Sequence, residues 1–101
     1  MKLFKSVDDK LKDLGFEKVV DEGETENKFG ASYMRVVPIN NDDNYIHRLD
    51  ILHKASGKHL IQSYEEGTNS DGFNNMVGLT YEVIKLAMKK YRQLKRKYKW
   101  N

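Results

Sequence analysis

YIHRLDILHKASGKHLIQSYE, residues 45–65, is the stretch that decides how this chain folds, because it predicts a β-hairpin. Two runs rich in β-branched and aromatic residues, Tyr45–Lys54 and Lys58–Glu65, flank the short segment ASG. A three-residue connection that ends in glycine is a common hairpin loop, with the glycine in the left-handed conformation. We therefore expect the two runs to pair antiparallel and Gly57 to have a positive φ.

The length of this loop fixes which residues of the two strands face each other. A three-residue loop gives the pairs Leu49 with Ser63, Ile51 with Ile61, and His53 with His59. Leu49, Ile51 and Ile61 then share one side of the sheet, so we expect all three to be buried beneath helices. A two-residue turn at Ser56-Gly57 would shift this pairing and is the alternative.

Two further strands are predicted before the hairpin. FEKVVDE (Phe16–Glu22) and KFGASYMRVV (Lys28–Val37) have the composition of strands, and Pro38 ends the second because proline has no N–H to donate. The polar segments EGETEN and INNDDN are predicted to be a turn and a loop. Consecutive strands with short connections pair antiparallel, so we expect about four antiparallel strands.

A helix is predicted at each end of this sheet. Apolar residues at helical spacing place the first over Lys2–Leu14, with Gly15 ending it and Phe16 folding back on Leu11. The last helix is predicted to begin with Thr80 as its N-cap and to run to about Tyr98. In the connection before it, three apolar residues are the expected anchors to the core: Phe73, Met76 and Val77.

The resulting order is α-β-β-β-β-α, which predicts an α+β fold with a single layer of antiparallel strands flanked by N- and C-terminal helices. The 101 residues suffice for one domain, 1–101, and not for two.

Charge is distributed unevenly along the chain. Residues 81–101 hold eight lysines and arginines against Glu82 alone, a net charge of +7, whereas residues 1–80 have a net charge of −4. At about 100° per residue, Lys85 and four further cations that fall within about 40° of it form a basic stripe of five. They are Lys85, Lys89, Arg92, Arg96 and Lys99. Six apolar residues form a neighbouring arc that we expect to face the core: Ile84, Ala87, Met88, Tyr91, Leu94 and Tyr98.

This basic stripe has several interpretations. It could be only the solvated face of a packing helix, because Lys and Arg favour helices and complement the helix C-terminus. It could instead contact phosphates, with Tyr91, Tyr98 and Trp100 stacking on bases. Binding of an acidic protein is a third interpretation, and binding to a membrane surface is the fourth and the weakest. Leu86 lies off the predicted core arc, which favours an interface on the helix and leaves a homo-oligomer open.

Other chemistry is poorly supported by the sequence. The chain has no cysteine, which fits the cytoplasm and excludes disulfides and thiolate metal sites. The start of the sequence does not read as a signal peptide, and no apolar run is long enough for a membrane span. His53 and His59 could approach a metal together, but no third ligand is evident, so we expect no metal and no cofactor. Arg48 and Asp50 are expected to form a surface ion pair. No catalytic motif is present, which predicts a protein that is not an enzyme.

The second half of the chain resembles uncharacterised small proteins of phages and prophages of Gram-positive bacteria. The resemblance covers about residues 45–100, and its most distinctive part is HLIQSYEEGTNSDGFNNMVGLTYEV. It implies a small accessory factor that binds a host or phage macromolecule in the bacterial cytoplasm, and it supplies no catalytic residue. We therefore expect a non-enzymatic binding module that binds nucleic acid through the basic C-terminal helix. The alternative is a protein–protein interaction or oligomerisation module with no nucleic-acid role.

Overall fold

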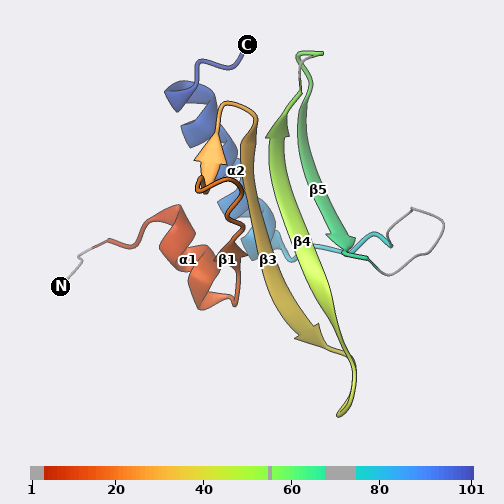
Figure 1. Cartoon of the computed structure of the whole chain (residues 1–101). Helices are drawn as coiled ribbons and strands as arrows, with labels where there is room; N and C mark the ends of the chain where they lie inside the picture. The colour runs from red at the N-terminus through yellow and green to blue at the C-terminus, as the bar shows by residue number, and fades with distance from the viewer. Residues whose placement is uncertain (1–3, 55, 68–74) are drawn as a thin grey trace.

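The computed structural model describes residues 4–54, 56–67 and 75–101. Two helices and five strands follow one another along the chain, and Figure 1 shows their arrangement. They are α1 (Val7–Asp13), β1 (Glu17–Lys18), β2 (Glu26–Asn27), β3 (Gly30–Pro38), β4 (Asn44–His53), β5 (His59–Glu65) and α2 (Tyr81–Lys97). The predicted α+β fold, an antiparallel sheet with a helix before and after it, is confirmed. No helix in the described part of the chain is long and apolar enough to cross a membrane.

The sheet has the strand order β1-β3-β4-β5, and β2 pairs with the start of β3. All pairings are antiparallel, and the register of the β4–β5 hairpin is the predicted one, with Leu49 opposite Ser63 and His53 opposite His59. Gly57 has a φ of 86°, as a three-residue loop requires. A two-residue turn is therefore excluded, and the hairpin that decides the fold is confirmed.

α1 begins later than the sequence predicts, at Val7 rather than Lys2. Ser6 accepts a hydrogen bond from the Asp9 N–H, and the Asp9 carboxylate accepts one from the Ser6 N–H, so a capping box fixes the first turn. Phe4, expected inside the helix, lies before this cap and is exposed. The end of the helix is as predicted: Gly15 has a φ of 92°, and the buried Phe16 donates its N–H to the Leu11 carbonyl.

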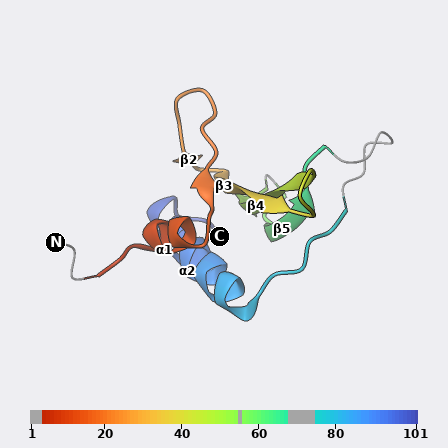
Figure 2. The same cartoon turned by 90° about the horizontal axis from the view of Figure 1, so that it is seen from below.

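Residues 17–30 depart most from the sequence prediction. The expected strand Phe16–Glu22 is only the two residues of β1, and the expected turn EGETEN contains β2. Between them, residues 19–25 form an arm that projects away from the two helices at the side of the sheet where β1 and β2 lie (Figure 2). Gly30 then enters β3 so close to β4 that an added Cβ would lie 2.0 Å from the Ile51 carbonyl oxygen. This close approach explains why a glycine stands there.

Both helices lie on one side of the sheet, as Figure 2 shows, and the core forms between these two layers. Its buried members are Val7, Leu11, Phe16, Ala31, Tyr33, Leu49, Ile51, Val83, Leu86, Ala87, Leu94 and Trp100. Leu49 and Ile51 are fully buried as predicted, but the prediction for Ile61 was wrong, since its side chain is 37% exposed. α2 packs against β4, whereas β5 is an edge strand.

Two smaller predictions also need correction. Arg48 and Asp50 do form an ion pair at 3.4 Å, yet it is not on the surface, because Asp50 is buried and also accepts a hydrogen bond from the Tyr64 hydroxyl. Burial, and then the bond to Asp50, raise the pKa of Tyr64 to about 12. Met76 is exposed rather than anchored, although its backbone bridges to Tyr64. Val77 is half-buried, and Phe73 lies outside the described residues.

Candidate nucleic-acid interface

The orientation of α2 determines what its cations can reach. Its buried residues are Val83, Leu86, Ala87, Lys90 and Leu94. Counted at about 100° per residue, they centre roughly opposite Lys85 and about 80° around from the predicted core arc. The prediction that Ile84 faces the core was wrong, since Ile84 is 40% exposed. Leu86 is only 7% exposed, so the sequence argument for an interface at Leu86 fails.

This rotation turns the basic stripe directly toward solvent. Lys85, Lys89, Arg92 and Arg96 are all exposed, and we call these four residues the α2 row. Within the described residues, none of the four forms an ion pair or a side-chain hydrogen bond. Asp13 and Glu82 line a shallow hollow beside Lys85 and Lys89 without pairing with them. Lys99, the fifth predicted cation, is exposed but follows the helix, at a φ of 55°.

Two other cations of α2 are neutralised by the body of the protein. The buried Lys90 ammonium lies 2.9 Å from Glu26 and 3.3 Å from Asp8, and Lys97 lies 2.9 Å from Glu26. Lys18 bridges the same two carboxylates, and Tyr33 donates its hydroxyl to Asp8. We call these six residues the Asp8–Glu26 network. The acidic body therefore absorbs part of the charge of α2, and it offers the α2 row no ion-pair partner among the described residues.

Carboxylate pKa values reflect this pairing. Burial alone would raise the pKa of the Glu26 carboxyl, but hydrogen bonds from Lys18, Lys90 and Lys97 hold it far below its usual range. Burial opposes the same effect at Asp8, where hydrogen bonds from Lys18 and Tyr33 lower the pKa of the carboxyl. Both acids therefore stay ionised at neutral pH and hold their lysines.

The aromatic residues predicted to stack on bases are not available for that role. Trp100 is buried, stacks on His53 with ring centroids 5.0 Å apart, and donates its Nε1–H to the Lys28 carbonyl. Tyr91 and Tyr98 pack against the core, and the Tyr91 hydroxyl lies 2.8 Å from His59 Nδ1. The aromatic residue that sequence reasoning missed is Tyr81. It is 86% exposed at the start of α2, and helical counting places it about 40° from Lys85.

The histidine pair is part of this aromatic cluster. His53 and His59 are neighbours as predicted, with ring centroids 4.9 Å apart. Both ring nitrogens of His59 have partners, Tyr91 Oη and the Asn101 carbonyl oxygen, which leaves neither free for a metal. Among the residues described, no three His, Asp or Glu side chains are grouped as a metal site would require. The absence of a bound metal stays a prediction.

A second polar cluster, which the sequence did not reveal, lies in the sheet at Arg35, His47 and Ser63. The Arg35 Nε–H donates to His47 Nδ1 at 3.0 Å, and His47 Nε2 lies 2.7 Å from Ser63 Oγ. Because Nδ1 is the acceptor, Nε2 carries the ring hydrogen and donates to the serine. Burial, and then the charge of Arg35, lower the pKa of His47 and keep it neutral. In this tautomer His47 does not accept a proton from Ser63, so the cluster lacks the base of a hydrolytic triad.

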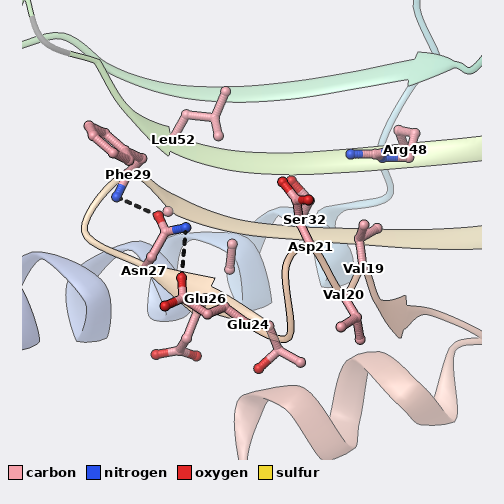
Figure 3. Close-up of a pocket in the computed structure, with 13 residues that line it drawn as sticks. Val19, Val20, Asp21, Glu24, Glu26, Asn27, Phe29, Ser32, Arg48 and Leu52 are labelled. Atoms are coloured by element: carbon pink, nitrogen blue, oxygen red, sulfur yellow. Dashed lines mark hydrogen bonds between the residues drawn. The ribbon is translucent and has the colours of Figure 1, made fainter.

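A hollow of about 400 Å³ lies where the arm meets β3 and β4. Figure 3 shows Val20, Asp21 and Glu24 from the arm on one side and Leu52 and Arg48 from β4 on the other. Its visible hydrogen bonds are local, since Asn27 accepts from the Phe29 N–H at 2.8 Å and donates to Glu24. These polar groups shape the turn into β3 and do not converge on a ligand position.

Comparison with known proteins adds no further constraint on this site. The chain matches no protein-family model, no curated protein and no solved structure. The α2 row, exposed and without a partner in the described part of the chain, is therefore the feature that bears most directly on function.

Proposed function

We propose that this protein binds nucleic acid through the α2 row, with its four cationic side chains contacting backbone phosphates. The observation that carries the proposal is the absence of any acidic partner for these four side chains among the described residues, although acids neutralise Lys90 and Lys97 on the same helix. Uncompensated cations in a line attract a polyanion and release its counterions.

The row is long enough for several phosphates. At 1.5 Å of rise per residue, Lys85 and Arg96 lie about 16 Å apart along the helix axis. If all four cations contact phosphates, log K should fall with log salt at a slope near −3.6 on a duplex or near −2.8 on a single strand. Lysine and arginine contacts to phosphate carry no sequence information, so little sequence preference is expected.

The helix that presents the row is held firmly at both ends. Thr80 accepts a hydrogen bond from the Val83 N–H at the start, and the Trp100 N–H donates to the Lys95 carbonyl at the end. The pairing of Lys90 with Asp8 and Glu26 ties the middle of α2 to α1 and β2. The row therefore does not have to be ordered on binding, which lowers the entropic cost of association.

The resemblance to phage and prophage proteins also supports the proposal, because it implies a cellular location where nucleic acid is present. A small accessory factor in the cytoplasm of a Gram-positive bacterium would have access to phage and host nucleic acid. The resemblance does not distinguish between the two, and the proposal is for binding rather than for catalysis.

The decisive experiment replaces Lys89, Arg92 and Arg96 together by glutamine. Wild type should bind a fluorescent oligonucleotide at about 50 mM salt, and the triple variant should lose this binding, because three of about four counterion-releasing contacts are gone. Its melting temperature should be nearly unchanged, since the three side chains are exposed and unpaired within the described structure.

A matched control replaces Lys12, Lys54 and Lys58 by glutamine. These lysines are also exposed, and the net charge falls by the same three units, but they lie outside α2. The control should keep most of the affinity. If both triple variants lost the same affinity, overall charge rather than the α2 row would explain the binding. If the wild type did not bind the oligonucleotide, the proposal would be wrong.

A further inference from the structure

The α2 row ends at an exposed aromatic ring. Tyr81 is the first residue of α2 and is 86% exposed, with no hydrogen bond from its hydroxyl among the described residues. Helical counting places it one turn before Lys85, on the side of the row where Ile84 and Met88 follow. Ile84 is 40% exposed and Met88 is half-buried. Over the first turns of α2, one side of the cationic line is therefore apolar and begins with an aromatic ring, and the exposed Lys95 follows further along that side.

We propose that the α2 row takes a single strand of nucleic acid, with an unpaired base stacked on the Tyr81 ring. The inference rests on the proposed function and adds the class of nucleic acid. The backbone phosphates would follow Lys85, Lys89, Arg92 and Arg96, while the bases turn toward the apolar side of the row. Cations that track the backbone next to an aromatic platform are the combination that single-strand binding uses.

A duplex would use only half of this surface. Inside a duplex both faces of each base are covered by neighbouring bases, so an aromatic side chain gains a stacking partner only when a base is unpaired. A helix that met duplex phosphates through the row would leave the Tyr81 ring in water. Only a single strand would contact the exposed Tyr81 ring and the cations of the row at the same time.

An anionic membrane surface would also attract these cations, but the apolar residues are arranged wrongly for it. A helix that lies in a membrane surface buries a broad apolar face among the lipid chains. The broad apolar face of α2 is already buried in the core, through Val83, Leu86, Ala87 and Leu94. The middle of its outward face is charged rather than apolar. A membrane is therefore the less suitable partner.

The test compares Tyr81→Ala with wild type on two probes, a 12-nucleotide oligo-dT and a 12-base-pair duplex, each followed by fluorescence anisotropy at about 50 mM salt. Loss of one stacked base should weaken oligo-dT binding about tenfold. Duplex binding should change less than about twofold, and Tyr81→Phe should keep oligo-dT affinity because it keeps the ring. The melting temperature should not change, since the side chain is exposed.

The outcomes separate this inference from the proposed function. If Tyr81→Ala binds oligo-dT as well as wild type, or loses duplex binding equally, the single-strand inference is overturned. Binding that still depends on Lys89, Arg92 and Arg96 would then leave the proposed function standing. If wild type binds neither probe, the proposed function fails and the inference with it. Binding to phosphatidylserine vesicles in place of oligo-dT would overturn both and indicate a membrane surface.

Discussion

At the scale of single residues, the two helices end with the same backbone device but different amino acids. At both ends a residue with positive φ follows the helix, and the N–H of the next residue donates a hydrogen bond to a carbonyl in the last turn of the helix. α1 uses Gly15, for which this conformation carries no Cβ penalty, whereas α2 uses Lys99 at a φ of 55°. The conformation at Lys99 is strained, and it persists because Trp100, the next residue, is buried in the core.

Lys99→Gly should therefore stabilise the protein. Removing the Cβ from a residue in the left-handed conformation relieves about 1–2 kcal/mol of backbone strain. The greater conformational freedom of glycine in the unfolded chain offsets part of this gain. We expect a net increase of about 0.5–1 kcal/mol in the free energy of unfolding, measured by urea denaturation.

Gly15→Ala provides the reciprocal control for that experiment. An added Cβ at Gly15 meets nothing within 4 Å, so only the backbone strain changes. The substitution should destabilise by about 1 kcal/mol. If Lys99→Gly and Gly15→Ala shifted the free energy of unfolding in the same direction, backbone strain would not be the property that distinguishes these two positions.

At the scale of elements, α2 has more apolar residues than one face can hold. Most of its apolar residues lie on one side of the cationic row and Leu86 lies on the other, and only some of them reach the core. Leu86 is 7% exposed and Ile84 is 40% exposed. The helix therefore packs on the face that contains Leu86 and leaves the face that contains Ile84 partly in solvent. The face that packs is the one that also contains Lys90.

Leu86→Ala and Ile84→Ala form a matched pair that tests this orientation. Truncating the buried leucine should cost about 2–4 kcal/mol, as other buried leucines do, because it removes apolar contacts and leaves a cavity. Truncating the half-exposed isoleucine should cost less than about 1 kcal/mol. Chemical denaturation measures the free energy of unfolding of both variants. A larger loss of stability for Ile84→Ala would show that the helix packs on the arc expected from the sequence.

This element also shows where sequence reasoning reaches its limit. The β4–β5 register could be predicted because strand alternation and the loop ending in Gly57 agree. The face of α2 could not be, because Lys90 occupies the buried side through partners on α1 and β2, Asp8 and Glu26. These contacts span 82 and 64 positions in sequence, and no local pattern encodes them. The candidate site was found as a set of cations, but its outward orientation and the exposure of Tyr81 required the packed structure.

At the scale of the whole molecule, the Asp8–Glu26 network joins α2 to four elements from the first half of the chain, α1, β1, β2 and β3. Glu26 on β2 meets Lys90 and Lys97 on α2, and Asp8 on α1 meets Lys90 and Lys18. Lys90 is buried, so its charge has to be compensated by these carboxylates. The same network that neutralises one side of α2 fixes the helix so that its other side presents uncompensated charge. Folding thus uses Lys90 and Lys97, and the four cations of the α2 row remain for the proposed binding.

Acid should therefore weaken the fold through this network. Both carboxylates have pKa values below those of an unfolded chain, which lie near 4, so their contribution to stability is complete above about pH 5. It is lost as the pH falls below 4 toward the lowered values in the folded state, because protonation then releases Lys18, Lys90 and Lys97.

Glu26→Gln isolates this effect. It leaves Lys90 buried with only Asp8 to compensate its charge, which should cost about 3 kcal/mol at pH 7. The variant should also lose less stability than wild type between pH 5 and pH 3, because it lacks the carboxylate with the more strongly lowered pKa. Urea denaturation at several pH values measures both quantities. Parallel curves for wild type and Glu26→Gln below pH 5 would show that the acid sensitivity arises elsewhere, and an unchanged stability at pH 7 would show that apolar contacts, rather than this network, hold α2 in place.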